Sequence, residues 1–141
     1  MRGSTVYAGG QFTTISGQPR PYLAALDAQS GAPTAFAPQP DGVVNALVLD
    51  GNTLYVGGRF ANIGGQPRHS LAALDAASGV ATSWVPDREF FAVDALALDG
   101  KQLDVGGVIA RPDGVHEYTV VAQRTWRGVG PSWATDRKSV V

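Results

Sequence analysis

The feature that most constrains this chain is an internal repeat with a period of about 48 residues, a length typical of repeat architectures. Residues 15–31 (ISGQPRPYLAALDAQSG) align with residues 63–79 (IGGQPRHSLAALDAASG), and 13 of the 17 aligned positions are identical. A third, partial copy begins at Gly100 with GKQLDVGG and ends at Gly107. Such repeats are supersecondary units that bury a core only against their neighbours, so the sequence predicts a stacked repeat fold.

The copies cover about residues 3–50 and 51–99, and a third copy begins at residue 100. Near the end of the second copy the spacing increases by one, which requires one inserted residue within residues 87–92. We therefore expect a repeat region over residues 1–107 and a non-repeat tail over residues 108–141.

Each copy is expected to contain four short β-strands. In residues 43–58 two β-rich stretches meet at Asp50-Gly51, a dipeptide that favours a tight hairpin turn. A Gly-rich connection follows, then a third strand around residues 70–74 and a fourth around residues 81–85, which together make an antiparallel meander. The alternative is a helix through each LAALDA segment, since Ala and Leu are strong helix formers. Proline upstream and Ser-Gly downstream leave about ten residues for it, which is marginal for a helix.

The expected strands have no consistently polar face. Strict alternation in residues 44–49 places Val, Ala and Val on one face and Asn, Leu and Leu on the other. A sheet with one face in water alternates apolar and polar residues, so these sheets are expected to be covered on both faces. The natural cover is the next copy of the same sheet, as in a β-propeller, where blades stack around an axis. Phe36 and Trp84, which end the fourth strand of each copy, are predicted to dock neighbouring blades against each other.

The predicted fold class is therefore all-β, with about two four-stranded antiparallel blades of an incomplete β-propeller and an irregular C-terminal tail. Propellers typically close with about 4 to 8 blades, and residues 1–107 supply barely two. We accordingly interpret the chain as a fragment whose remaining blades belong to the parent propeller. Two blades would expose an apolar face at each end, so self-association is expected.

The motifs YVGG-x-F, IGGQPR, LAALDA-x-SG and ALALDG resemble bacterial β-propeller proteins of the delta-sixty-repeat and quinoprotein-like superfamily, over about residues 3–107. Residues 71–84 (LAALDAASGVATSW) resemble the tryptophan-docking repeat of that superfamily, in which the Trp locks one blade to the next. Trp84 follows Gly79 by five residues, whereas the commonest form has four. This departure favours the delta-sixty-like branch, whose members are usually large secreted or surface-attached bacterial proteins without known catalysis.

The tail differs from the repeats in charge and composition. Residues 1–107 contain 6 basic and 9 acidic residues, whereas residues 108–141 contain 5 basic and 3 acidic residues and two of the three Trp. One hypothesis is a reading-frame slip in a GC-rich gene; the alternative is a genuine capping segment, which would also be atypical. Residues 136–141 (DRKSVV) resemble the translation of a common sequencing adapter, and long-read sequencing of the locus tests that origin.

Composition excludes several classes of function. The net charge of −1 disfavours a nucleic-acid binder that relies on broad electrostatic attraction. No apolar run approaches the roughly 18 residues that a membrane span needs. With no Cys, the chain has neither disulfides nor a thiolate site. The start MRGSTVYAGG lacks the apolar region of a signal peptide, so a signal peptide is not expected in this fragment.

The titratable residues suit turn and loop positions, so we expect no catalytic residues, no cofactor and no metal. His69 and His116 have no partner at metal-ligand spacing and are expected in surface loops. Arg20 and Arg68 follow Gln-Pro in both copies and are expected to bind a backbone carbonyl or an Asp; an anion-binding ring is the alternative. Four aspartates recur at turn positions, where Asp caps its own backbone: Asp27, Asp50, Asp75 and Asp99.

Residues that both copies share are explained by blade formation, so a specific site should consist of residues that differ between the copies. The main differences are Arg59 in place of Gln11, His69-Ser70 in place of Pro21-Tyr22, and the stretch 87–91 around the insertion.

The stretch around the insertion supplies the candidate partner-contact loop, which consists of Arg88, Glu89, Phe90 and Phe91. An exposed Phe pair beside charged residues suits an interface with a partner. The alternative is that one Phe packs on Trp84 and the other residues are solvated.

These features predict a non-catalytic scaffold or binding module, a fragment of a bacterial propeller protein that is secreted or attached to the cell surface. The expected partner is an unknown protein or glycan, with no nucleic acid and no membrane span. The alternative is a fragment of a quinoprotein-like oxidoreductase whose cofactor ligands lie in absent blades. A third, weaker possibility is an inert structural spacer.

Overall fold

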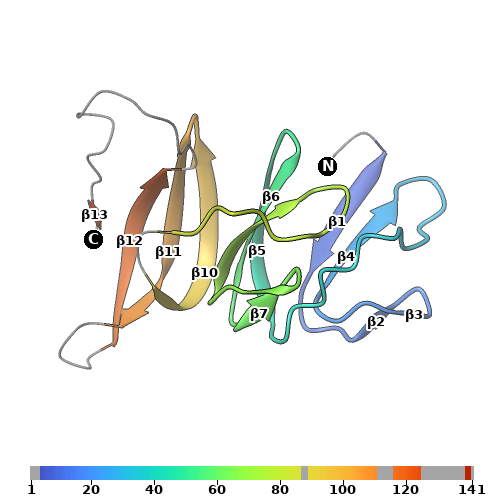
Figure 1. Ribbon diagram of the computed structural model, residues 1–141, viewed down its shortest axis with the longest axis horizontal. Coiled ribbons are helices and arrows are strands. Elements are labelled where there is room, and N and C mark those ends of the chain that lie inside the picture. The colour runs from blue at the N-terminus through green and yellow to red at the C-terminus, as the bar shows by residue number, and fades with distance from the viewer. Residues whose placement is uncertain (1–3, 87–88, 111–115, 125–138, 141) are drawn as a thin grey trace.

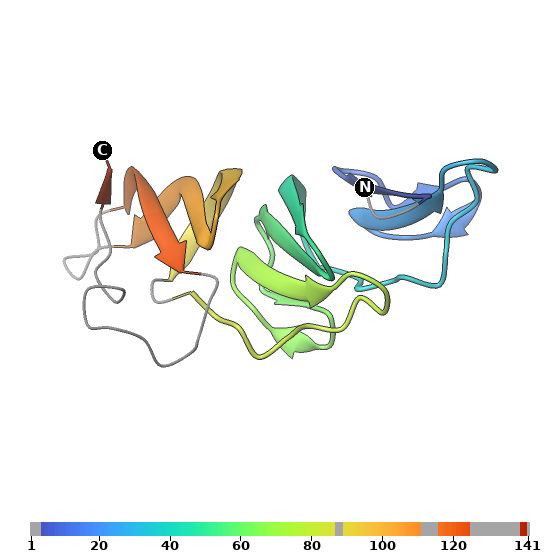
Figure 2. The same cartoon turned by 90° about the horizontal axis from the view of Figure 1, so that it is seen from above.

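The computed structural model describes residues 4–86, 89–110, 116–124 and 139–140 of the 141-residue chain. These residues are all-β: the strands form antiparallel sheets, and no helix occurs among them. Three larger sheets follow one another along the long axis (Figure 1), and the view turned by 90° shows them side by side (Figure 2). The prediction of an all-β fold is confirmed.

We number the three larger sheets in chain order. Sheet 1 pairs β1 (Thr5–Gly9) with β4 (Leu23–Asp27). Sheet 2 has the order β5 (Val44–Asp50), β6 (Thr53–Gly58), β9 (Leu71–Asp75). Sheet 3 has the order β10 (Phe90–Asp99), β11 (Gln102–Ala110), β12 (His116–Arg124), β13 (Ser139–Val140). Two short hairpins complete the strands: β2 (Thr14–Ile15) with β3 (Gln18–Pro19), and β7 (Asn62–Ile63) with β8 (Gln66–Pro67).

The three larger sheets share one strand order, but the boundaries of the sheets differ from the boundaries of the sequence copies. Strand β5 comes from the end of the first copy and pairs with β6 at the start of the second. Strands β1, β6 and β11 are second in this strand order, and β4, β9 and β12 are third. Strands β5 and β10 hold the first position, which no strand fills in sheet 1 among the described residues.

The LAALDA segments are strands, so the helical alternative is wrong. Both segments lie beside the second-position strand of their sheet, for example with Ala73 opposite Tyr55. Leu23, Ala24 and Ala25 of the first segment and all Leu and Ala residues of the second are buried, and successive strand residues point to opposite faces. Burial on both faces of a sheet therefore outweighs the local helix propensity of Ala and Leu.

The expected fourth strand is reduced to a single bridge in each of the first two sheets, Leu26 with Pro33 and Leu74 with Ala81. Proline at position 33 has no N–H for a ladder. In sheet 2 the Thr82 N–H still donates to the Ala73 carbonyl at 2.8 Å, and the chain then leaves the sheet edge. The prediction of four short strands in each blade is thus wrong for sheets 1 and 2, where the fourth is a single bridge.

The tail is not irregular throughout, in contrast to the prediction from the sequence. Strand β11 continues past Gly107, where the third copy ends, and β12 then pairs with β11 along its length. Thr119 and Val121 are buried while Tyr118 and Val120 are exposed, which is the alternation of a strand with one covered face. Residues 125–138 and 141 lie outside the described residues, as does most of the proposed adapter segment.

Turn chemistry follows the sequence closely. The hairpin loops start at Gly51 and Gly100, and both residues have a positive φ. This left-handed region of the backbone favours Gly. Asp50 pairs with Thr53, so the first loop is Gly51-Asn52, one residue later than expected.

Two of the repeated aspartates cap their turns, as predicted. The Asp27 carboxylate accepts the Gln29 and Ser30 N–H groups at 2.8 and 3.0 Å, and Asp75 accepts those of Ala77 and Ser78 at 2.9 Å. The backbone hydrogen bonds from Ser30 and Gln29 lower the pKa of Asp27, because they favour the charged carboxylate.

A β-bulge changes which residues share a face. The register of β5 on β6 shifts between Val44 and Ala46, and the register of β10 on β11 shifts at the equivalent place. The bulge brings Val44 onto the face of Leu47 and Leu49, toward sheet 1, whereas Val48 packs toward sheet 3. The strict alternation assumed for residues 44–49 is therefore wrong, although both faces are covered.

Neighbouring sheets approach closely at two glycines in equivalent positions. A Cβ atom on Gly9 would lie 2.5 Å from Val44 Cγ1, and one on Gly57 would lie 2.4 Å from Val93 Cγ1. Sheet 1 thus packs on sheet 2 at the same point where sheet 2 packs on sheet 3. Among the described residues the three sheets form an open row that does not close into a ring or barrel (Figure 2).

Candidate functional site

The residues that differ between the copies meet on one surface at the junction of sheets 2 and 3. Three adjoining hollows of about 380, 340 and 370 Å³ mark this surface. The first two share His69 and Glu89, and the last two share Ser70 and Phe91. We call it the junction surface and define it by these residues: Arg59, Phe60, Ala61, His69, Ser70, Glu89 and Phe91.

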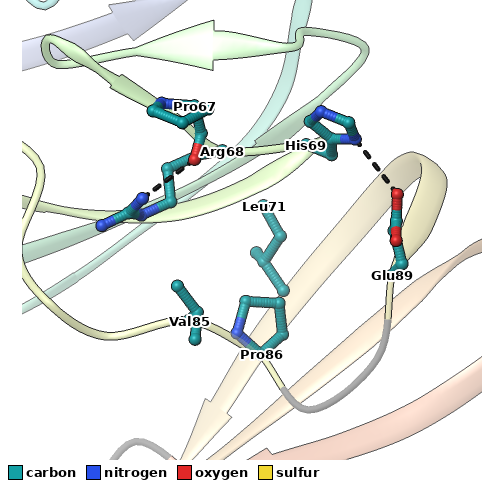
Figure 3. Close-up of a pocket in the computed structure, with 7 residues that line it drawn as sticks. All are labelled: Pro67, Arg68, His69, Leu71, Val85, Pro86 and Glu89. Carbon is teal, nitrogen blue, oxygen red and sulfur yellow. Dashed lines mark hydrogen bonds and ion pairs between the residues drawn. The ribbon is translucent and has the colours of Figure 1, made fainter.

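The first hollow has an apolar wall and a polar mouth (Figure 3). Leu71, Val85 and Pro86 supply the apolar lining. The His69 side chain points toward Glu89, and Nδ1 lies 3.2 Å from Oε1. Both side chains are more than half exposed, so this contact adds little to stability and remains accessible to a partner.

The two phenylalanines of the predicted contact loop have different surroundings. Phe90 is only 2% exposed and joins the apolar cluster that contains Trp84 and Val93. Phe91 is 55% exposed and lines two of the hollows. Successive strand residues point to opposite faces, so the start of β10 directs one ring inward and the next outward. Arg88, the remaining member of the loop, lies outside the described residues.

Ser70 holds Phe91 in place through the backbone. The Ser70 hydroxyl donates to the Phe91 carbonyl at 3.1 Å. Ser70 has a positive φ, and the Leu71 N–H donates to the His69 carbonyl at 2.8 Å. This hydrogen bond closes a three-residue turn. Tyr22 has the same φ and the same turn in the first copy, so this strained turn belongs to the repeat and not to the site alone.

Arg68 lines the first hollow, but its guanidinium is engaged in the fold. Nη1 donates to the Pro67 carbonyl and Nη2 to the Thr82 carbonyl, each at 2.9 Å. Arg20 makes the equivalent bonds, to Pro19 at 2.8 Å and to Thr34 at 2.9 Å. The prediction that these arginines bind backbone carbonyls is confirmed.

Asp41, which the sequence comparison did not single out, lines the third hollow beside Arg59. Its carboxylate accepts the N–H groups of Ala61 and Asn62 at 2.8 and 3.1 Å, and the Asn62 side-chain amide at 2.9 Å. The hydrogen bond from the Asn62 side chain is the largest cause that lowers the pKa of Asp41. The Pro-Asp-Gly sequence at residues 40–42 is typical of a turn, but it does not indicate the hydrogen bonds between Asp41 and Asn62 of β7.

The predicted docking residues lie between sheets. Phe36 is 1% exposed in the cluster between sheets 1 and 2, and Trp84 is 6% exposed in the cluster between sheets 2 and 3. Phe36 packs edge-on against Tyr7, with ring centroids 5.3 Å apart. Trp84 packs edge-on against Tyr55, with ring centroids 5.4 Å apart. Edge-on contact is a favoured geometry for aromatic pairs, so each docking ring is fixed against a tyrosine of its own sheet.

No group of three or more His, Cys, Asp or Glu that could hold a metal is found in the described residues. The side chain of His116 lies outside them. The described part of the chain also contains no helix with the length and hydropathy of a membrane span.

The fold and the junction surface define an all-β protein built from repeated antiparallel sheets, with its distinctive residues gathered at one sheet junction. No protein-family model, curated protein or solved structure matches this chain.

Proposed function

We propose that this chain is a non-catalytic binding module, a piece of a β-propeller of the delta-sixty-like kind from a secreted or surface-attached bacterial protein. The support for a propeller is the repeated stacking: equivalent glycines, bulges and edge-on aromatic pairs recur at both sheet junctions. Sheets that use the same contacts to pack on the next sheet can continue into a ring.

The observation that carries the binding role is the convergence of copy-specific residues on the junction surface. Residues shared by the copies, such as Arg68 and Asp75, bond to backbone groups and build the sheets. The copy-specific residues Arg59, His69 and Phe91 instead line open hollows. These side chains have no role that is common to both copies, so we assign them to recognition of a partner.

The composition of the junction surface favours a protein partner. Aromatic residues and arginines are enriched at protein interfaces, and the junction surface has the exposed Phe91 ring together with Arg59 and the accessible His69–Glu89 pair. Phe91 is the anchor, since its exposed ring would be buried by a partner, while Arg59, His69 and Glu89 form a polar rim around it.

A phage-displayed random peptide library, selected on the full chain, tests this assignment. Peptides that bind should lose at least about tenfold in affinity for Phe91→Ala, because anchor residues at interfaces cost about 2 kcal/mol or more on truncation. Val80→Ala is the matched control, since Val80 is 56% exposed and lines none of the three hollows.

Equal binding to wild type and Phe91→Ala would contradict the proposed surface. A glycan array that shows saturable, Phe91-dependent binding, with no peptide selected, would reassign the partner to carbohydrate. If no ligand of either class depends on Phe91, the binding role fails and a purely structural scaffold is left.

A further inference from the structure

A second surface, on the opposite side of sheet 2, forms an apolar groove beside the edge of β1 that faces away from β4. The groove has a volume of about 400 Å³ and is lined by Val6, Tyr7, Leu47, Leu49 and Leu54. In the described residues β1 pairs with β4 on one side only. An unpaired strand edge beside an apolar groove is the arrangement that accepts an added strand.

In sheets 2 and 3 the strand edge equivalent to this edge of β1 is paired with another strand of the chain. Strand β6, the equivalent of β1, is paired by β5 on that edge, and β11 is paired by β10. Both added strands run antiparallel to their partner, and both have the sequence pattern Ala-Leu-x-Leu-Asp-Gly at their end.

The side chain that fills the equivalent groove is known from the junction of sheets 2 and 3. Val48 of β5 lies opposite Tyr55 and packs against the same apolar cluster as Leu96 and Leu98, a cluster that contains Leu103. These three leucines are the equivalents, one repeat later, of Leu47, Leu49 and Leu54 in the open groove. Tyr7 is likewise the equivalent of Tyr55.

The burial of the two equivalent tyrosines differs, as expected if a strand covers one junction and not the other. Tyr55, covered by β5, is 4% exposed, whereas Tyr7 is only partly buried. The first junction therefore lacks the apolar side chain and the strand that close the second.

We propose that the edge of β1 binds an extended polypeptide segment with the pattern of β5, which adds as an antiparallel strand and places an aliphatic side chain opposite Tyr7. This site is separate from the junction surface and does not depend on the function proposed for it. The partner segment is apolar on both faces and ends in Asp-Gly, as Val44–Asp50 and Gly51 do.

The probe is a synthetic, dye-labelled peptide with the sequence of residues 44–51 (VNALVLDG), titrated into the full chain and followed by fluorescence anisotropy. Saturable binding is expected. A peptide with Asp at the position of Val48 should bind at least about tenfold more weakly, because a carboxylate would enter an apolar groove. The two peptides differ at one position, so the protein's own folding is not perturbed.

Cross-linking locates the peptide. A photoreactive benzoylphenylalanine at the position of Val48 should cross-link to Tyr7, Leu47 or Leu49, mapped by mass spectrometry. Cross-links at the edges of β5 or β10, no saturable binding, or equal binding of the Asp peptide would each overturn the proposal.

A second copy of the chain is the competing occupant. Because the sequence has no Cys, Val6→Cys introduces a single thiol at the groove. Rapid disulfide formation between Val6→Cys chains that excess peptide does not suppress would show that β1 edges pair with each other and would also overturn the proposal.

Discussion

The stacking of the sheets makes a sharp prediction at the glycines of the second-position strands. Gly57 of β6 faces sheet 3, and a Cβ at this position would lie 2.4 Å from Val93 Cγ1 and 3.1 Å from Val93 Cβ. Gly106 of β11 is its equivalent, but a Cβ there would meet nothing closer than the Tyr118 hydroxyl at 3.6 Å. Neither glycine has a positive φ. Gly57→Ala and Gly106→Ala are therefore the same substitution with and without a facing sheet.

The expected magnitudes follow from two opposing effects. Replacing Gly by Ala where the backbone tolerates it stabilises a protein by about 0.4–1 kcal/mol, through the unfolded chain. Overpacking a filled interface costs about 1–3 kcal/mol. Gly106→Ala should therefore raise the free energy of unfolding by up to about 1 kcal/mol. Gly57→Ala should lower it by about 1–2 kcal/mol, since the clash outweighs the entropic gain.

Urea unfolding at one fixed protein concentration measures the difference, with far-UV circular dichroism as the readout. The double variant Gly57→Ala/Val93→Ala separates the clash from other effects. Val93→Ala removes Cγ1, the methyl group that collides, so the two substitutions should couple favourably by about 0.5–3 kcal/mol. Gly9→Ala, which would meet Val44 Cγ1 at 2.5 Å, should behave like Gly57→Ala.

Equal stability of Gly57→Ala and Gly106→Ala, or additive effects of Gly57→Ala and Val93→Ala, would refute the sheet stacking. Without that stacking the case for a propeller has no structural support. A midpoint change accompanied by an altered urea slope would instead indicate that the substitution changes the extent of unfolding.

Four further outcomes are expected. Trp84→Ala should lower the free energy of unfolding by about 3–5 kcal/mol in urea titrations, because a buried ring leaves a cavity between sheets 2 and 3; a loss below about 1 kcal/mol would contradict its docking position. Arg20→Ala and Arg68→Ala should reduce the melting temperature by similar amounts, since both side chains make the same two carbonyl contacts, and a clear difference would contradict that equivalence. In the folded chain the pKa of Asp41 lies below its ordinary value of 3.8. The charged carboxylate therefore stabilises the fold above pH 3.8, and this stabilisation is lost as the pH falls through the folded pKa. The difference in the free energy of unfolding between wild type and Asp41→Asn, measured by urea titration across pH, should become smaller on acidification. The full chain should associate in a concentration-dependent way through the exposed Tyr118 and Val120 of β12, and Tyr118→Lys should weaken this in sedimentation velocity, whereas a monodisperse wild-type monomer would contradict it.

Much of the fold was predictable because repetition doubles each local signal. Ala and Leu favour helix in the LAALDA segments, but the proline upstream and Ser-Gly downstream leave too few residues for one in both copies, and the segments are strands β4 and β9. Asp27 and Asp75 recur before Ser-Gly, and both cap the turn as expected. Arg20 and Arg68 likewise make their carbonyl contacts in both copies.

The predictions from the sequence are wrong where the structure depends on contacts that the repeat period does not indicate. The bulge after Val44 is set by pairing with β6, and it reverses the face of one residue without any Gly or Pro to mark it. Strand β12 lost the repeat sequence but kept the β-branched run Thr119 to Val121, so propensity carried a signal where the period did not. Trp84 leaves the sheet edge to become buried, which shortens the fourth strand to one bridge.

The candidate site shows the same division. Comparison of the copies identified Arg59, His69 and Phe91 as residues without a role in the repeat. It could not show that they are neighbours, because Phe91 reaches His69 only through the packing of sheet 3 on sheet 2. Nor did it find Asp41, whose contacts with Ala61 and Asn62 join segments that are distant in the sequence.

A stacked repeat gives a physical reason for binding residues to gather at a junction. Inside each sheet, a substitution must satisfy two packed faces and a hydrogen-bond ladder, so the copies stay alike at positions such as Leu71 and Leu23. At the rim of a junction, side chains from two sheets meet with one side in water, and changes such as Pro21-Tyr22 to His69-Ser70 leave the strained turn intact. The positions free to diverge are therefore also the positions that two sheets bring together, which is the condition for a composite surface that recognises a partner.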